Sequence, residues 1–189
     1  LMCFSGQIVV VGGVRRSAMI SLSNLSDDRM RHAKSGQWWE TAAHRALANN
    51  SVTYTERPDT ETFMREWLSL VESKSGERGV FNREASKKQA QKYGRRDPNH
   101  EFGTNPCSEI ILRPYQFCNL TEVVVRATDS INDLERKVRL ATILGTIQSS
   151  YTKFPYLRKV WQRNTEEERL LGVSLTGIMD NPLMTKKNK

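Results

Sequence analysis

The residues best suited to chemistry lie in the middle of the chain, in the hexapeptide NPCSEI at residues 105–110. Side chains of an extended segment alternate between two faces, so we expect Asn105, Cys107 and Glu109 to point the same way. Pro106 is compatible with such a segment because proline can occupy the first position of a strand. The pattern predicts one wall of an active site, which combines an amide, a sulfur that can lose hydrogen and a carboxylate that can accept a proton.

Two simpler interpretations compete with this one. Free cysteine is often a small buried apolar residue, so Cys107 could belong to the core. That interpretation leaves unexplained the carboxylate on the same face and the second thiol at Cys118. A zinc site with His100 is the other alternative, but the cysteines lack the tight paired spacing of structural zinc motifs and a fourth ligand is not evident. We therefore expect no metal site.

Several segments in the same order carry a resemblance to one family. The segments are VVVGGVRRSA (9–18), NNSV (49–52), SGERG (75–79), NPCSEI (105–110), FCNLT (117–121) and RLLGVSLTG (169–177). Together they resemble the large, catalytic chains of ribonucleotide reductases, particularly the adenosylcobalamin-dependent class II group.

The resemblance implies a role for each residue of the central constellation. Cys107 matches the cysteine that becomes a thiyl radical and takes the 3′ hydrogen of the ribose. Glu109 matches the general base at the 3′ hydroxyl, and Asn105 the amide that binds the substrate. Cys118 matches one of two thiols that reduce C2′ and finish as a disulfide. The implied activity is reduction of ribonucleotides to deoxyribonucleotides, with adenosylcobalamin as the radical source.

The first 26 residues are predicted to form a strand, a loop and a second strand. Gln7–Val11 is a β-branched run, and Met19–Ser23 reads as the second strand. From the residues alone, the loop between them is a basic hairpin turn. In the reductases the corresponding loop reads the substrate base and communicates with the allosteric specificity site. The resemblance therefore assigns substrate binding to Gly13, Arg15, Arg16, Ser17 and, beside the thiol, Ser108.

Alternating strands and helices indicate an α/β fold with mainly parallel strands. Thr60 is expected to cap a helix whose apolar residues share one face, with Trp67 in the core or packed against another helix. These residues are Phe63, Trp67, Leu70 and Val71. Asn82 and Ser130 (or Asn132) are expected to cap two further helices, and Thr165 with Glu168 a third.

The resemblance implies that residues 1–189 are a fragment of the ten-stranded α/β barrel of the reductases. Residues 1–26 would hold the specificity loop, and residues 100–126 the active-site finger loop and the strand after it. A complete catalytic chain is several times longer. The redox partner of Cys118 is expected upstream of Leu1, and Cys3 is not a convincing substitute.

Composition fits a cytoplasmic chain, because three cysteines are too few for a disulfide framework and no signal peptide or membrane-spanning segment is evident. The formal net charge of +8 is spread along the sequence, so specific nucleic-acid binding is the less favoured alternative. An inactive reductase fragment is another. The expected partners are a ribonucleotide, ATP or deoxynucleotide effectors, the remaining reductase segments and a thioredoxin-like dithiol.

Overall fold

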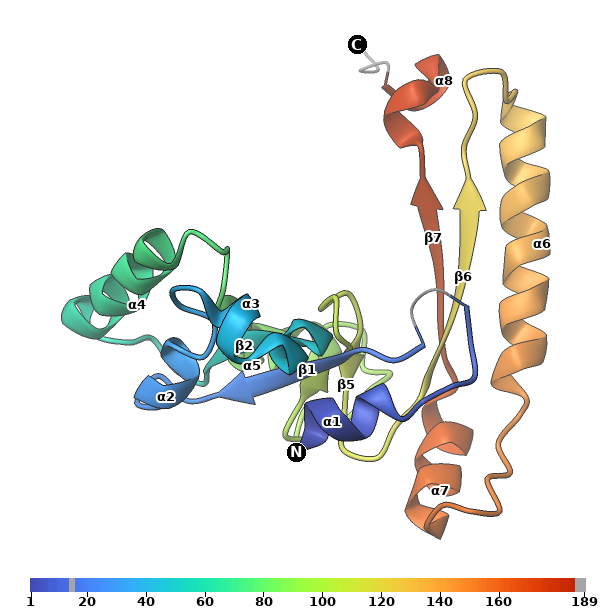
Figure 1. The fold of residues 1–189 in the computed structure, drawn as a ribbon. Coiled ribbons are helices and arrows are strands. Elements are labelled where there is room, and N and C mark those ends of the chain that lie inside the picture. The colour runs from blue at the N-terminus through green and yellow to red at the C-terminus, as the bar shows by residue number, and fades with distance from the viewer. Residues whose placement is uncertain (14–15, 186–189) are drawn as a thin grey trace. The chain divides into compact units, whose positions relative to one another are not determined.

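A computed structural model describes residues 1–13 and 16–185, and the chain divides into two units, residues 1–114 and 115–189. Both units mix helices with parallel strands (Figure 1). No helix within the described ranges has the length and apolar character needed to cross a membrane.

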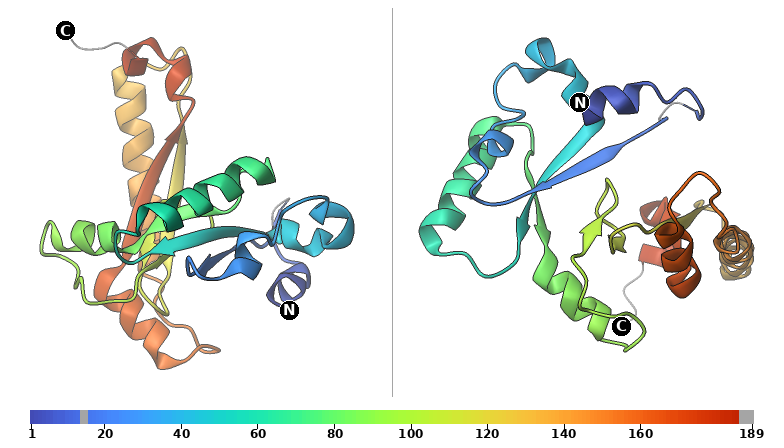
Figure 2. Two further views of the ribbon diagram at one scale, coloured as in Figure 1. Left: turned by 90° about the vertical axis from the view of Figure 1, so that its left-hand side faces the viewer. Right: turned by 90° about the horizontal axis from the view of Figure 1, so that it is seen from below.

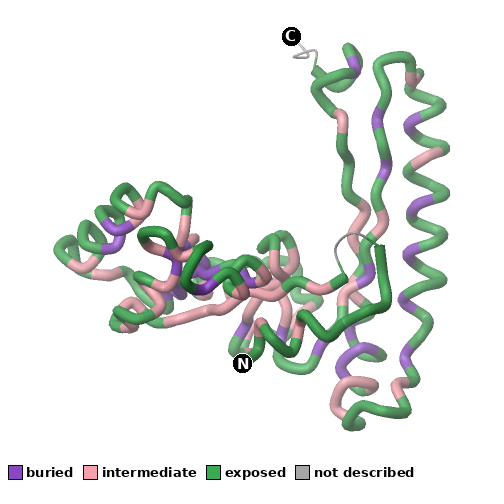
Figure 3. Tube along the Cα trace, in the orientation of Figure 1, coloured by how far each residue is buried: buried purple, intermediate pink, exposed green. Residues whose placement is uncertain are grey.

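Three parallel strands form the main sheet of the first unit. They are β1 (Met19–Ser23), β2 (Ala48–Tyr54) and β3 (Gly79–Asn82), in the order β1-β2-β3. The prediction of a strand at Met19–Ser23 is confirmed. β2 is the central strand and the most buried one in the first unit, whose purple segments in Figure 3 mark buried residues. Val52 of this strand is fully shielded from solvent. A strand with neighbours on both sides has its backbone N–H and C=O groups hydrogen-bonded to those neighbours, so it can be buried.

Helices connect these strands. The first unit contains α1 (Met2–Gln7), α2 (Asp28–Arg31), α3 (Trp38–Thr41), the 3₁₀ helix η1 (Ala43–Leu47), α4 (Thr60–Ser73) and α5 (Arg83–Gln91). Asn82 caps α5 as predicted, because its side chain accepts a hydrogen bond from the Ala85 amide. The cap of α4 is Asp59, one residue before the expected Thr60.

The strand expected at Gln7–Val11 is wrong. Helix α1 occupies residues 2–7, and Val10 and Val11 after it are 73% and 82% exposed. A β-branched run becomes a strand only where a neighbouring strand offers hydrogen bonds, and β1 pairs with β2 rather than with this segment.

Helix α4 is turned the opposite way from the prediction. Its buried side chains are the polar Glu66 and Ser69, whereas Phe63, Trp67 and Val71 are 43%, 55% and 59% exposed and Leu70 is half-buried. The expectation that the apolar stripe faces the core is therefore wrong. Helical periodicity identified the two faces correctly but could not show that a buried ion cluster would select the polar one.

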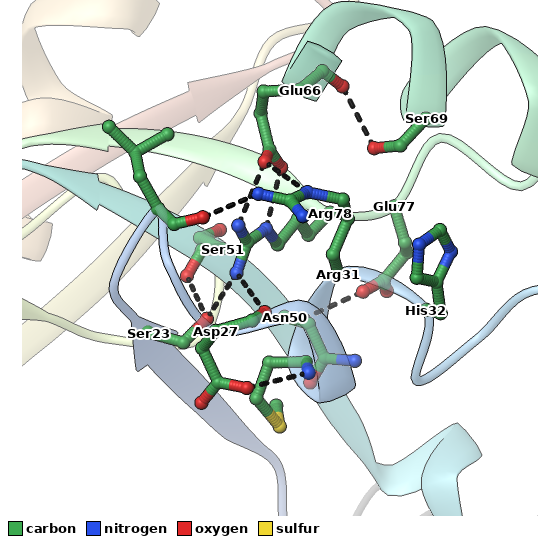
Figure 4. Close-up of polar contacts among 12 residues, drawn as sticks. Ser23, Asp27, Arg31, His32, Asn50, Ser51, Glu66, Ser69, Glu77 and Arg78 are labelled. Carbon is green, nitrogen blue, oxygen red and sulfur yellow. Dashed lines mark hydrogen bonds and ion pairs between the residues drawn. The ribbon is translucent and has the colours of Figure 1, made fainter. Parts of the chain in front are cut away.

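That cluster centres on the Glu66 carboxylate (Figure 4). Arg78, which precedes β3, donates to both Glu66 oxygens at 2.6 and 2.8 Å, and Arg31 of α2 donates at 3.0 Å. Arg78 also donates to the Ser23 hydroxyl at the end of β1. Burial would raise the pKa of Glu66, but hydrogen bonds and charge from the two arginines outweigh burial and hold that pKa below its ordinary value.

The second unit is a parallel strand pair with its crossover helix. It contains β6 (Cys118–Val124), α6 (Ile131–Ser149), α7 (Lys159–Glu168), β7 (Leu170–Thr176), the 3₁₀ helix η2 (Ile178–Asp180) and α8 (Pro182–Thr185). Figure 2 shows α6 lying along the β6–β7 pair. Ser130 caps α6 through a capping box with Asp133, which confirms the predicted start of this helix.

The capping box expected at Thr165 and Glu168 is wrong. Both residues lie in the last turns of α7 and are buried, and the chain turns into β7 after Arg169, which has a left-handed backbone. A threonine followed three residues later by glutamate also fits a helix interior, so the pattern alone did not distinguish the two ends.

The described strands form open sheets: one of three strands, the β6–β7 pair and a short hairpin, β4 (Gly103–Thr104) with β5 (Ile111–Leu112). The mixed α/β class with parallel strands agrees with the prediction.

The ion cluster gives a test of stability. Glu66→Gln keeps the shape but leaves the buried Arg78 cation without its counter-charge, while Arg31 retains its ion pair with Asp28, so we expect a loss of about 3–5 kcal/mol in unfolding free energy at pH 7. Because the pKa is lowered in the folded state, this contribution is complete above the unfolded value of about 4.3 and is lost as pH falls through the folded value. The difference between the two proteins should therefore shrink below about pH 4. Urea unfolding across pH measures it.

The matched control is Glu61→Gln on the same helix, where an exposed pair with Arg65 spans 2.7 Å. It should change stability little. A Glu66→Gln protein as stable as the wild type at pH 7 would contradict the assignment.

Gly177, just after β7, gives a second test. Its φ is +74°, and a Cβ there would overlap the carbonyl oxygen of Val125. Gly177→Ala should lower the unfolding free energy by about 2–4 kcal/mol, because it combines left-handed strain with overpacking against backbone. Gly36 has φ of +62° with no atom within 4 Å, so Gly36→Ala isolates the strain and should cost about 1–2 kcal/mol. Equal losses in urea unfolding would rule out the close approach.

Candidate active site

The hexapeptide 105–110 is the loop of the β4–β5 hairpin in the first unit. Gly103 pairs with Leu112 and Thr104 with Ile111 in the antiparallel ladder. The two short strands hold the ends of the loop together, so the six residues between them form a compact projection. This arrangement differs from the extended strand expected at Asn105–Leu112, of which only Ile111 and Leu112 are strand.

The loop is closed by its own asparagine. The Ser108 amide donates to the Asn105 carbonyl at 3.0 Å, which makes residues 105–108 a β-turn. The Asn105 Oδ1 atom accepts from the Ile110 amide at 3.0 Å. Asparagine is common in turns because its short amide can replace a backbone partner in this way. A turn, rather than the pleat of a strand, therefore sets the directions of the Cys107 and Glu109 side chains.

Cys107, Ser108 and Glu109 are all exposed on this turn. Ser108 has a left-handed φ of +69°, an uncommon conformation for a residue other than glycine. Neither the Cys107 thiol nor the Glu109 carboxylate has a hydrogen-bond or ion-pair partner among the described residues. The alternative that Cys107 is a buried core residue is wrong. A thiol and a carboxylate two residues apart are thus both open to an incoming molecule.

Part of the loop that is predicted to bind substrate, residues 13–17, borders a cavity of about 380 Å³ in the first unit. Arg16 and Ser17 line it, together with Asn49 of β2. The Ser17 hydroxyl donates to the Gly6 carbonyl at 2.8 Å, which joins the segment before β1 to α1. Gly13 is exposed and does not line this cavity. Arg15, also predicted to bind substrate, lies outside the described residues.

Sequence reasoning missed Asn49. Its Nδ2 atom donates to the Pro106 carbonyl at 2.6 Å, so it connects the central strand to the Cys107 turn. Asparagine is depleted in strands, and the pair Asn49-Asn50 at the start of β2 was the available signal.

The segment SGERG supports the same strand. Glu77 accepts from the Asn50 amide at 2.8 Å and pairs with the buried Lys34 at 2.8 Å. Its neighbour Arg78 enters the Glu66 cluster. The role of this segment is therefore structural: it fixes the beginnings of β2 and β3.

Cys118 lies in the second unit, as the first residue of β6, where it pairs in register with Leu170 and is half-buried. Val123 is buried and Thr121 lies near Gly145 of α6, so alternate residues of β6 face that helix. Cys118 belongs to the other set and faces the side of the strand pair that α6 does not cover.

Comparison with known proteins gives one consistent result. No family model matches the chain, and no solved structure matches it. The adenosylcobalamin-dependent ribonucleoside-triphosphate reductase of Lacticaseibacillus paracasei is 34% identical over 181 residues, which cover 93% of this chain and 23% of that protein. The enzymes of the same name from Levilactobacillus brevis and Lactobacillus leichmannii are each 31% identical, over 97% and 93% of this chain and 24% and 23% of those proteins.

The chain spans about a quarter of the length of these curated relatives. The similarity covers nearly all of the chain, including the Cys107 turn and the strand that begins at Cys118. We conclude that this chain is homologous to one segment of the adenosylcobalamin-dependent ribonucleoside-triphosphate reductases.

Proposed function

We propose that the chain carries the thiyl-radical centre of an adenosylcobalamin-dependent reductase and works with the remaining segments of that enzyme. The observation that carries this proposal is the exposed turn, where the structure gives Cys107 and Glu109 no hydrogen-bond or ion-pair partner in residues 1–13 and 16–185. The names of the relatives favour a ribonucleoside triphosphate as substrate. The parallel strands of both units are compatible with a ten-stranded barrel completed by those other segments.

In the proposed reaction, Cys107 gives up its hydrogen atom and the sulfur radical then takes the 3′ hydrogen of the ribose. Glu109 accepts the proton of the 3′ hydroxyl, and the 2′ hydroxyl takes a proton from one of two thiols and leaves as water. The two thiols become a disulfide and supply the two electrons and the second proton that place a hydrogen at C2′. Glu109 then returns its proton to the 3′ oxygen, and Cys107 returns the 3′ hydrogen atom to the ribose, which restores the sulfur radical. Cys118 is the proposed thiol on this chain. A thioredoxin-like dithiol would restore it between turnovers.

Asn105 would have two tasks. Its Oδ1 atom is engaged by the Ile110 amide, which holds the turn. Its Nδ2 group has no acceptor in the described part of the chain and can donate to a substrate oxygen. Ser108, exposed between the thiol and the carboxylate, can do the same with its hydroxyl.

The cavity beside Arg16 and Ser17 is the proposed recognition site. A guanidinium offers a planar set of donors to a base edge or a phosphate, and the serine hydroxyl can donate or accept. We assign Gly13 and Arg15 to the same loop by resemblance. ATP or deoxynucleotides would act as effectors through it.

Adenosylcobalamin, when bound, would supply the radical that removes the hydrogen atom from the Cys107 thiol. The exposure of this thiol fits the requirement, since a sulfur sealed in the core could not meet an external radical source. On this chain Cys107 would face the cofactor, and the turn would hold the thiol in a fixed direction.

The test is a chimaera in which this chain replaces the matching segment of the L. paracasei enzyme. Cys107→Ala should abolish deoxynucleotide formation with adenosylcobalamin, because the hydrogen-abstracting atom is gone. Cys118→Ser should block turnover with the dithiol reductant but still allow loss of tritium from the 3′ position of labelled substrate. Cys3→Ala, the matched thiol control in α1, should leave the rate unchanged. Turnover by a folded Cys107→Ala chimaera would overturn the proposal, as would a folded but inactive unmutated chimaera.

The recognition site has its own prediction. Arg16→Ala should change the relative kcat/KM of the four ribonucleotides by about tenfold, because a positioned arginine contact is worth roughly 1–3 kcal/mol. Arg29→Ala, which removes an exposed arginine from α2, should leave these ratios unchanged. Unaltered base preference in a folded Arg16→Ala chimaera would remove Arg16 from the recognition site.

A further inference from the structure

We propose that Asn49 is a positioning residue, which fixes the direction of the Cys107 backbone by holding the Pro106 carbonyl. The inference rests on the proposed function for the importance of that direction. The Asn49 Nδ2 group donates to Pro106 O at 2.6 Å across the first unit, from the start of β2 to the tip of the β4–β5 loop.

This hydrogen bond connects the turn at residues 105–108 to another element of the first unit, the strand β2. Every other hydrogen bond of residues 105–109 runs to residues 104–110 of the same loop, within the part of the chain that the structure describes. Those local bonds give the loop its shape. They do not by themselves fix the loop relative to β2, which the Asn49 bond does directly. The chain on either side of the loop is held separately, because Arg83 Nε donates to the Phe102 carbonyl at 2.7 Å and Arg96 Nη1 donates to the Ile111 carbonyl at 2.9 Å.

The Pro106 carbonyl oxygen, which accepts the hydrogen bond from Asn49, can affect the orientation of the Cys107 thiol. The Pro106 carbonyl and the Cys107 nitrogen and Cα belong to one planar peptide unit. Restricting the carbonyl oxygen therefore restricts rotation of the whole plane, and with it the direction in which the Cys107 Cβ leaves the backbone. A reacting atom displaced by about 1 Å can cost about 100-fold in rate.

Asn49 itself lies in β2, a strand that is held by its neighbours. Asn49 is paired with Ile20 of β1, and the next residue, Asn50, is held through its amide by Glu77. Glu77 in turn binds the buried Lys34. A side chain on a strand that is fixed on both sides loses little further freedom when it makes a hydrogen bond.

Asn49 also lines the cavity shared with Arg16 and Ser17. One residue therefore contacts both the recognition cavity and the turn with the thiol. A nucleotide group in that cavity would lie against the side chain that holds the Cys107 peptide.

Asn49→Asp is the sharpest variant, because it keeps the shape, removes the donor and sets a carboxylate against the Pro106 carbonyl. Asn49→Ala removes the contact without repulsion, and Asn132→Ala on α6 is the matched exposed control. In the full chain, the Ser108 and Ile110 amides should exchange hydrogen about three- to tenfold faster in both Asn49 variants, as expected for one lost hydrogen bond. Amides of β6 and α6 should not change. NMR of the labelled protein measures each site.

Unchanged amide hydrogen exchange at Ser108 and Ile110 in a folded Asn49→Asp protein would show that Asn49 does not restrain the turn. In the reductase chimaera, loss of positioning should lower kcat by about tenfold or more while KM stays the same. Faster exchange with an unaltered kcat would overturn the positioning role. An inactive unmutated chimaera would instead count against the proposed function, while the exchange result would still decide whether Asn49 ties the turn.

Discussion

The buried Glu66 carboxylate, held by two arginines, is the interaction on which the first unit depends. Arg78 and Glu66 are almost completely excluded from water, so neither charge could remain there without the other. The cluster joins α4 and α2 to the end of β1 and the beginning of β3.

From this cluster, a chain of contacts leads to the thiol. Arg78 is followed by β3, and its predecessor Glu77 holds the Asn50 amide at the start of β2. Asn49, the residue before Asn50 in β2, donates a hydrogen bond to the Pro106 carbonyl of the exposed turn. Under the proposed positioning role, the direction of Cys107 would depend on a strand that is itself held by buried charge. Internal ion pairs also explain part of the basic composition, because Arg31 and Arg78 pair with Glu66 and Lys34 pairs with Glu77.

Local chemistry in the sequence predicted the elements whose signals are local. β1 at Met19–Ser23 and the caps Asn82 and Ser130 are where short-range propensity and capping place them. The strand at Gln7–Val11 and the inward apolar face of α4 were wrong because both depend on distant partners: a neighbouring strand in one case, and the Glu66 cluster in the other.

The site shows the same division. The types and spacing of Asn105, Cys107 and Glu109 predicted a radical chemistry that remains a proposal, and the alternation of a strand gave the wrong geometry for what is a turn. The Asn49 contact joins residues far apart in the chain, so no local pattern could reveal it.

The most direct measurement of the central claim is electron paramagnetic resonance on the chimaera, frozen during reaction with adenosylcobalamin and substrate. Cysteine deuterated at Cβ should narrow the signal of a sulfur-centred radical, and Cys107→Ala should remove that signal. A signal that ignores the label or persists without Cys107 would contradict the account.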